Sequence, residues 1–335
     1  MAQLFEKDAV AKPQEWANLI ANIESDATPF TSMIAKRKRP NQMLHYWQCK
    51  KYATTGHKGV LDGKDATEFH SNQGQELTGV AQKTWRNPGV SDFMEEVEVA
   101  GIKGSNMADQ IADALVTVKR QIEKRCLSNE ENARDDGVDQ ANETRGLLKW
   151  SDNSFTSYGV PSDFQTPTLS KSSVSALGSF TEAIFKTMGQ TAYKERKGPA
   201  KSDGFVGVEL KQAFTDFTTY QPVTGASQVC ARTFNQQASS RELIDTVDRL
   251  VLDTGTYTLH LTSFLHTNAS TGEDSAFTHK SGIFVDLDMC GLAYTRLPRV
   301  KRLDYQGGGH KAIVDAIFML MVDNPLTMMP LLHNS

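Results

Sequence analysis

The sequence predicts an α+β protein whose first half consists mainly of an extended ribbon and one long helix. Residues 42–101 alternate as in β-strands, around a middle (residues 51–79) rich in Gly, Lys, Asp, His and Gln. Residues 105–128 have helical periodicity, and several strand-like segments follow toward the C-terminus. Two strands alone are marginally stable in water, so we expect the ribbon to be stabilised by another surface, most simply a neighbouring copy.

Length and composition indicate a globular protein with room for roughly two domains. The chain has 335 residues, of which 39% are hydrophobic and 23% charged. Its net charge of −4 argues against the overall basicity that accompanies tight phosphate binding. The sequence begins without the apolar stretch of a secretory signal, and no apolar run is long enough to span a bilayer. We therefore expect a soluble intracellular protein.

The four cysteines predict neither a zinc site nor a disulfide framework. Cys49, Cys126, Cys230 and Cys290 form no CxxC pair and have no histidine cluster beside them. We expect reduced thiols, no bound metal and no cofactor.

The first forty residues predict a short helix, an apolar segment and a basic run. Residues 13–25 have apolar side chains at helical spacing, and Pro13 suits a first turn. This helix could dock as an arm on another surface or pack on the chain's own core. The apolar segment TPFTSMI (residues 28–34, hereafter the clip) leads into the basic run KRKR at residues 36–39. No aromatic residues alternate with the basic run, so it suits a solvated or interface position better than single-strand stacking.

Residues 105–128 predict the most regular helix of the chain. At 1.5 Å per residue it is about 36 Å long, and its one narrow apolar stripe suits a spine lying across a sheet. Residues 130–143 (hereafter the acidic loop) are acidic and Asn-rich and predict an exposed loop. The stripe consists of Ile111, Leu115, Val118, Ile122 and Cys126.

The second half predicts a compact domain at residues 171–299 and strands near the C-terminus. Ser179 resembles the N-cap of a helix that ends near Gly198, with Glu182 completing a capping box. A strand (GFVGVE), a helix (ELKQAFTDF) and a hairpin within residues 242–265 follow. Residues 284–294 and 311–322 predict the last core strands, separated by a glycine turn at residues 307–309.

One triplet matches a catalytic motif. Asp253-Thr254-Gly255 resembles the loop that presents the catalytic carboxylate of aspartic proteases, and a single copy would require a homodimer. The triplet also lies between two alternating runs, where Asp-Thr-Gly forms a tight hairpin turn. We favour the turn.

Other candidate sites are weaker. The segment GGGHK at residues 307–311 departs from the phosphate-binding loop pattern. His260 and His266 match no common ligand spacing and are expected at the surface. Asp286 and Asp288 are expected on one strand face, where they are more simply solvated than bound to a cation.

Several segments, in order along nearly the whole chain, resemble a family of tailed-phage major capsid proteins with the Hong Kong-type capsid fold. A Gly-rich turn followed by a strand and Asn324-Pro325 also fits, although Gly308-Gly309-His310 stands where a more Asp-containing turn is expected. The resembling segments are TPFTSMI at residues 28–34, the Trp47, Tyr52 and Gly63 pattern, ETRGLLKW at residues 143–150, the hairpin at residues 253–255, and DLDMCGLAYTR ending at Arg296.

The resemblance implies a division into named parts. Residues 1–43 correspond to an N-terminal arm and residues 44–100 to an extended β-hairpin loop. Residues 101–170 and 300–335 correspond to a peripheral domain containing the spine helix (residues 105–128), and residues 171–299 correspond to an axial domain.

The resemblance also implies a function. The chain is expected to self-assemble, as hexamers and pentamers, into the icosahedral shell around the double-stranded DNA of a tailed phage. A portal protein, and in some cases scaffold or decoration proteins, are the implied partners, without a membrane. The virion is the implied location, after assembly in the host bacterial cytoplasm. Two alternatives are a dimeric aspartic protease using Asp253 and a non-viral compartment shell of the same fold.

Twelve residues are candidate subunit-interface positions. We expect the basic run to pair with an acidic surface of an adjacent subunit, either the acidic loop or Glu95, Glu96 and Glu98. Several such exposed pairs together can fix register, although each alone contributes little. The candidates are Phe30, Met33, Ile34, Lys36, Arg37, Lys38, Arg39, Trp47, Tyr52, Glu95, Glu96 and Glu98.

Overall fold

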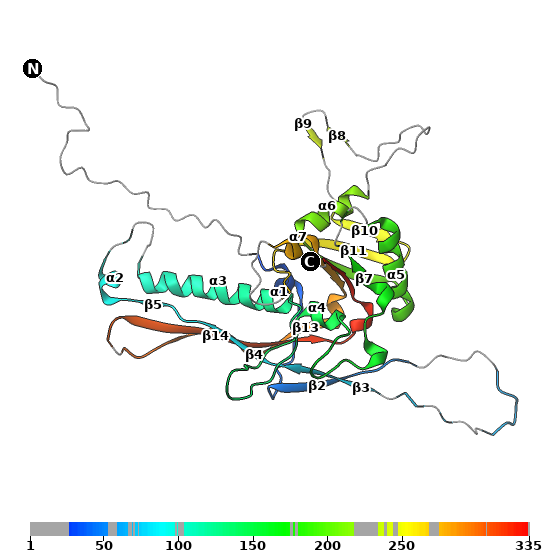
Figure 1. Cartoon of the computed structure of the whole chain (residues 1–335), viewed down its shortest axis with the longest axis horizontal. Helices are drawn as coiled ribbons and strands as arrows, with labels where there is room; N and C mark the ends of the chain where they lie inside the picture. Colours follow the sequence, from blue (N-terminus) through cyan, green and yellow to red (C-terminus); the bar gives the residue numbers. More distant parts are fainter. Residues whose placement is uncertain are drawn as a thin grey trace, which may run out of the picture. The chain divides into compact units, whose positions relative to one another are not determined.

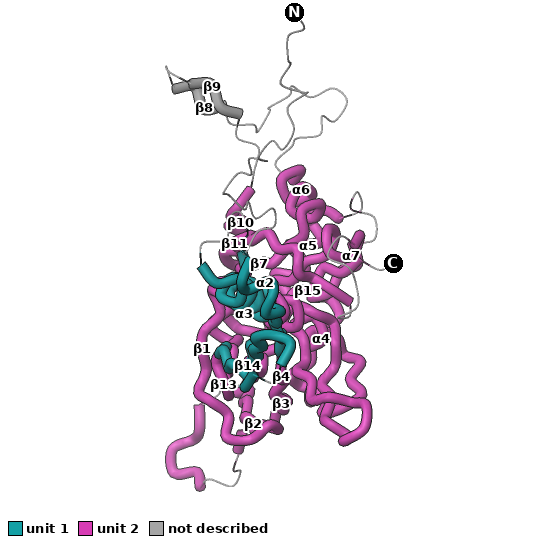
Figure 2. Tube along the Cα trace, turned by 90° about the vertical axis from the view of Figure 1, so that its left-hand side faces the viewer, with its two compact units in different colours: residues 1–27, 85–118, 298–315 teal, residues 28–84, 119–297, 316–335 magenta. Residues whose placement is uncertain are grey.

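The computed structural model separates the chain into two compact units (Figure 2). Unit 1 comprises residues 1–27, 85–118 and 298–315, and unit 2 comprises residues 28–84, 119–297 and 316–335. The helix predicted at residues 13–25 lies outside the described residues. The structure describes residues 27–52, 59–65, 69, 71–72, 74–97, 99, 104–174, 177, 180–217, 234–237, 240–243, 247–267, 275–305 and 307–333.

Unit 2 contains a six-stranded sheet, of which Figure 1 labels the strands β7, β10 and β11. The strand β7 pairs in parallel with β11 on one side and antiparallel with β12 on the other. The strand order is β10 (Arg249–Leu252), β11 (Gly255–Leu261), β7 (Ala200–Val206), β12 (Gly282–Val285), β15 (Met329–Leu332) and β6 (Ser172–Ser173).

Aromatic side chains from α5 (Glu182–Arg196), α6 (Val208–Asp216) and this sheet form its core. The ring of Phe185 lies 5.1 Å from those of Phe214 and Tyr257 and 5.0 Å from that of Phe284. Offset and edge-to-face contacts of this kind stabilise beyond simple area burial. The predicted capping box is wrong, because α5 begins at Glu182 with Thr181 as its N-cap and no side-chain cap; Ser179 itself lies outside the described residues.

The hairpin predicted around Asp253 is confirmed. The strands β10 and β11 pair antiparallel from Arg249↔Thr258 to Leu252↔Gly255, which leaves Asp253 and Thr254 as the turn. Gly255 has φ +152°, and a side chain there would collide with the backbone of Ala200 in β7. The position therefore requires glycine.

A second sheet contains the two longest strands, β13 (Cys290–Arg302) and β14 (His310–Val322), and both run through residues of the two units. Its order is β1 (Ala35–Arg37), β13, β14 and β4 (Gln82–Arg86), with β5 (Gly89–Val90) also paired to β14. In unit 2, residues 316–322 of β14 are all buried. The strand predicted at residues 284–294 is instead interrupted by the 3-10 turn Leu287–Met289, because the Asp286 carboxylate caps the turn by accepting the N–H of Asp288.

In unit 1, the helix predicted at residues 105–128 is confirmed as α3 (Asn106–Cys126), which continues into unit 2. The strand predicted through residues 92–96 is wrong, since these residues form the short helix α2 (Asp92–Glu96), capped by the Ser91 hydroxyl. Val90, Met107 and Ala312 form the buried core of this unit, with Ile111 packed against them.

The remaining elements are short. Among the described residues, no helix is long and apolar enough to cross a membrane. Cys49, Cys126 and Cys290 are buried free thiols, and Cys230 lies outside the described residues. The short elements are α1 (Pro29–Met33), β2 (Leu44–Cys49), β3 (Gln75–Val80), α4 (Leu147–Ser151), β8 (Phe234–Gln237), β9 (Ser240–Leu243), α7 (Ala276–Lys280) and 3-10 turns at Ser162–Phe164, Thr168–Ser170 and Pro325–Thr327.

Candidate functional site

The clip is held inside unit 2 by one buried carboxylate. The Glu123 side chain of α3 is fully buried and accepts the backbone N–H of Phe30 at 2.8 Å and that of Thr31 at 2.7 Å. These donors belong to the first turn of α1 (Pro29–Met33), where backbone N–H groups have no partner within the helix. Burial raises the pKa of Glu123, and the N–H groups of Thr31 and Phe30 oppose that rise.

This anchoring changes which clip residues can reach another subunit. Phe30 is fully buried with its ring edge-on to Phe205 at 5.1 Å, and Ile34 is also buried. Both are candidate interface residues, and within the single chain their side chains pack in unit 2, where Glu123 binds the start of α1. Met33, at 40% exposure, is the interface candidate of the clip that faces solvent.

The basic run also contains one residue that is bound within its own chain and three that are exposed. The strand β1 pairs in parallel with β13 from Ala35↔Gly291 to Arg37↔Ala293. The Arg37 guanidinium binds the Asp323 carboxylate at 2.7 Å and the Asp288 carbonyl at 3.1 Å, so Arg37 is engaged within its own chain. Its neighbours Lys36, Lys38 and Arg39 are exposed.

The ribbon has a packed base. β2 and β3 pair antiparallel from Leu44↔Val80 to Cys49↔Gln75. Trp47 donates its indole N–H to the Val322 carbonyl at 3.3 Å, and its ring lies 5.8 Å from that of Trp150 at a tilt of 51°, while Leu77 is buried. Trp47, a candidate interface residue, is therefore half-buried within unit 2.

The outer part of the ribbon (residues 50–74, hereafter the outer ribbon) exposes its described apolar side chains. Lys51 pairs with Glu195 at 2.8 Å, but the aromatic and aliphatic side chains beyond the base find no comparable burial. Apolar side chains this exposed contribute little to the stability of the isolated chain and are typical of protein contact surfaces. The exposed fractions are 79% for Tyr52, 78% for Val60, 80% for Leu61 and 88% for Phe69.

The acidic residues near α2 are only partly available. The Glu95 carboxylate accepts bonds from the Ser105 hydroxyl and from the Met107 N–H at 3.1 Å, and so caps the start of α3. Glu96 is exposed. Glu98, the third acidic candidate, lies outside the described residues.

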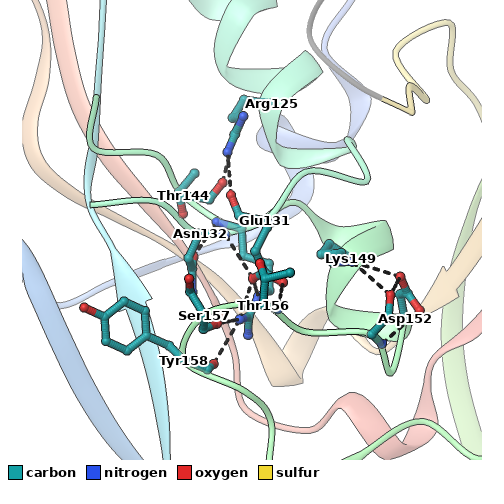
Figure 3. Close-up of polar contacts among 11 residues, drawn as sticks. Arg125, Glu131, Asn132, Thr144, Lys149, Asp152, Thr156, Ser157 and Tyr158 are labelled. Carbon is teal, nitrogen blue, oxygen red and sulfur yellow. Dashed lines mark hydrogen bonds and ion pairs between the residues drawn. The ribbon is translucent and has the colours of Figure 1, made fainter. Parts of the chain in front are cut away.

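The acidic loop is anchored by two buried arginines that sequence reasoning did not assign, and Figure 3 labels the first of them, Arg125. Arg125 donates to the carbonyls of Thr144 at 2.8 Å and Glu131 at 3.1 Å, and also pairs with Glu130 and Glu143. Buried charges are stable only when they are paired and hydrogen-bonded. Burial lowers the pKa of Arg125, whereas Glu143 opposes this change.

Arg145 is the second anchor. Its guanidinium lies 4.7 Å from the ring centres of both Trp150 and Phe155, and it binds the Glu131 carboxylate at 2.7 Å. It also donates to the carbonyls of Ser157 and Tyr158 (Figure 3). A planar cation between two rings is a favourable desolvated arrangement. The motif ETRGLLKW contains both Arg145 and Trp150. It was the one feature of the sequence from which this cluster could have been predicted.

A comparison with models of protein families identifies the chain. The family model described as SU10 major capsid protein matches residues 3–331. The chain belongs to the SU10 major capsid protein family. It is thus a major capsid protein of the tailed-phage type and a structural component of the virion shell, as the sequence predicted.

Solved structures agree on the fold of this major capsid protein. The capsid of a native GTA particle matches with a TM-score of 0.60 and 11% identity, covering 98% of both chains. The capsid of cyanophage P-SCSP1u matches with a TM-score of 0.61 and 10% identity, covering 98% of this chain and 96% of the other. Mycobacterium phage Bobi matches with a TM-score of 0.58 and 10% identity over 100% of both. The predicted Hong Kong-type fold is confirmed. No curated protein sequence matches.

The remaining sequence-derived sites of this major capsid protein are ordinary parts of the fold. Asp253 is exposed in its hairpin turn. His260 lies 3.2 Å from the Asp203 carboxylate, and His266, expected at the surface, is fully buried. Asp286 is buried and pairs with Arg196 rather than lying on a solvated strand face. No cluster of metal-ligating side chains occurs in the described part of the chain.

Proposed function

We propose that this major capsid protein self-assembles through hexamers and pentamers into the icosahedral shell around the double-stranded DNA genome of a tailed phage. The outer ribbon carries the proposal, because Tyr52, Leu61 and Phe69 are largely exposed and are buried only if another surface covers them. A contact between unlike surfaces of identical chains closes into rings when symmetry permits, and rings can tile a shell.

The partners follow from that role. A shell that fills with DNA must connect to a portal protein at one vertex, and scaffold or decoration proteins can add to it. The net charge of −4 suits a container, because many phosphate contacts on the lining would hold the DNA and resist its movement. We propose assembly in the host bacterial cytoplasm.

We also propose that the chain is not an enzyme. Asp253 is the one carboxylate that matched a catalytic motif in the sequence, and its position in the turn between β10 and β11 accounts for the triplet. An aspartic protease must bring two such carboxylates together so that they share a proton. A proteolytic activity inhibited by pepstatin and lost in Asp253→Asn would contradict this assignment.

Expression of the chain alone, followed by sedimentation and negative-stain imaging, tests the proposed assembly. We expect megadalton particles, or rings of five and six copies, across a range of salt and protein concentrations. A compact 37.0 kDa monomer under every condition would rule out self-assembly.

A second preparation with the exposed ribbon residues changed makes this test specific. Tyr52→Ser combined with Phe69→Ser should reduce particle yield, because both side chains are exposed and buried only on assembly. A matched control is Leu169→Ser, which changes another exposed apolar residue of unit 2 at 67% exposure outside the ribbon. Equal losses in both variants would assign the effect to general surface polarity rather than to the ribbon.

A further inference from the structure

A basic cavity lies where the end of β1 meets the start of β2 in unit 2. Its volume is about 490 Å³, and the side chains of Arg37, Lys38, Arg39 and His45 contribute to its wall. Leu44 and Met321 add an apolar surface. None of the described residues that line the cavity carries a carboxylate. The cavity therefore favours an anionic group attached to something apolar.

The cations of this cavity are presented by a fixed piece of chain. Arg37 binds Asp323 and the Asp288 carbonyl, and Pro40 is buried. Lys38 and Arg39 therefore lie between two anchored positions of the chain. Lys38 and Arg39 are exposed, and within the described part of the chain no ion pair involves either of them. Two cations remain for a ligand.

The acidic loop offers a matching ligand with a fixed shape. The Asp136 carboxylate accepts the N–H groups of Val138 at 2.9 Å, Asp139 at 3.1 Å and Gln140 at 3.0 Å. Asp135 accepts the N–H of Gly137 at 2.7 Å. These bonds to Val138, Gln140 and Asp139 lower the pKa of Asp136 and keep it ionised.

The base of the loop is equally constrained. Ala133 and Glu143 pair across it, and Arg125 and Arg145 hold its ends. A loop that is already ordered loses little conformational entropy when it binds. At its tip Val138 is 83% exposed, with Gly137 before it and Asp139 after it.

We propose that the tip of the acidic loop of one copy docks into the basic cavity of a second copy. Asp135 and Asp139 then face Lys38 and Arg39, and Val138 covers the apolar surface of Leu44 and Met321. The cavity and the loop both belong to unit 2, and among the described residues no hydrogen bond or ion pair joins them. Each copy therefore gives its loop to one neighbour and receives a loop from another, which is the head-to-tail contact that builds a ring.

The contact deepens the proposed function, since it names one contact of the assembling chain. Two acidic surfaces were considered as partners of the basic run, the acidic loop and the group Glu95, Glu96 and Glu98. The proposed contact favours the acidic loop. The Glu95 carboxylate is already used at the start of α3, whereas the Asp135 and Asp139 side chains are exposed. A nucleic-acid phosphate is the less suitable occupant, because it offers nothing to cover Leu44 and Met321.

Charge exchange tests the contact. Lys38→Glu with Arg39→Glu should lower particle yield at least tenfold, and so should Asp135→Lys with Asp139→Lys. The second pair removes the Asp135 bond to the Gly137 N–H and keeps the three bonds of Asp136 that hold the loop. The combined fourfold variant should recover yield to within about twofold, because the attraction is restored with reversed signs. Lys194→Glu with Lys201→Glu is the matched control, since both lysines are exposed elsewhere in unit 2, and should assemble normally.

Two outcomes of the exchange overturn the proposal. One is that the fourfold variant fails to assemble although each double variant has wild-type thermal unfolding. The other is that the Lys38→Glu, Arg39→Glu variant assembles normally but loses nucleic-acid binding, which would assign the cavity to phosphate.

A cross-linking experiment separates this contact from shell formation itself. Chains carrying Arg39→Cys and chains carrying Val138→Cys, both with Cys230→Ser, are purified separately, mixed and oxidised. A disulfide-linked dimer containing one of each is expected whether the product is a shell, a ring or a smaller oligomer. If wild-type particles form but the mixed dimer does not, the contact is wrong and the proposed function stands. If the mixed dimer forms without particles, the contact stands and shell assembly from the chain alone fails.

Discussion

Phe30 in the clip and Phe69 in the outer ribbon are both aromatic residues in short segments of the first seventy residues, yet Phe30 is fully buried and Phe69 is 88% exposed. The clip has a polar anchor inside the chain, because the Glu123 carboxylate binds two backbone N–H groups of α1. The outer ribbon has Lys51 paired with Glu195 near its base, but its apolar side chains stay exposed. Apolar content alone therefore does not decide which segment folds onto its own chain; the anchor does.

The largest expected effect is on the clip. Phe30→Ala should lower the free energy of unfolding by about 3–5 kcal/mol, because it removes a fully buried aromatic side chain and leaves a cavity. Urea unfolding of the wild type and the variant in the same oligomeric form measures this difference. A loss below about 1 kcal/mol would mean that the clip is not part of the core.

Glu123 should make the stability of the folded chain depend on pH. Because burial raises its pKa in the folded chain, its contribution to stability is full below the unfolded pKa of about 4.5 and is lost as pH rises through the folded value. The unfolding free energy of the wild type should therefore decline, relative to that of Glu123→Gln, as pH rises above about 4.5. A difference between the two proteins that does not change as pH rises would contradict the raised pKa.

Substitutions in the turn at Asp253 are a control for the clip and the outer ribbon, because they should change stability little. Asp253→Asn should change stability by less than about 0.5 kcal/mol, since Asn also tolerates turn conformations. Asp253→Ala should cost at most about 1 kcal/mol through lost polar interactions in the turn. Thermal unfolding of the two variants measures both values, and a cost above about 2 kcal/mol would assign Asp253 a structural role beyond the turn.

The smallest effect on stability is expected in the outer ribbon. Phe69→Ser should leave the free energy of unfolding of the unassembled chain within about 0.5 kcal/mol of wild type, since the side chain is exposed. Particle yield should nevertheless fall, and this divergence between stability and assembly distinguishes the ribbon from the clip. A large stability loss in unassembled Phe69→Ser would show that the ribbon packs on its own chain.

The elements that sequence reasoning predicted correctly are those set by local patterns. The stripe from Ile111 to Cys126 predicts α3 because its spacing is helical, and the Asp253 turn follows from turn residues between alternating strands. The strand β14 was also predicted, from its long apolar run. The family resemblance added the fold and the role in the shell, which spacing alone does not give.

The features that sequence reasoning did not predict are set by distant contacts. The packing of Phe30 and Ile34 within their own chain was not predicted, because Glu123, which binds the clip, lies more than ninety positions away from Phe30 in the sequence. Residues 92–96 were predicted as strand but form the helix α2. The Ser91 hydroxyl and the contacts of Glu95 and Asn106 at the start of α3 stabilise this helix. No local periodicity encodes such contacts. All twelve candidates remain interface predictions, and the exposed ones among the described residues are Met33, Lys36, Lys38, Arg39, Tyr52 and Glu96.

The reactivity of the buried cysteines can be used to measure how often the surrounding structure opens. Burial raises the pKa of Cys49 to about 11, so little of this thiol is the reactive thiolate at pH 7. Burial also raises the pKa of Cys126 and Cys290. An alkylating reagent should therefore modify these three thiols only when the surrounding structure opens. In a Cys230→Ser background, the mass of the labelled chain would report how often each region opens, for assembled and unassembled protein alike.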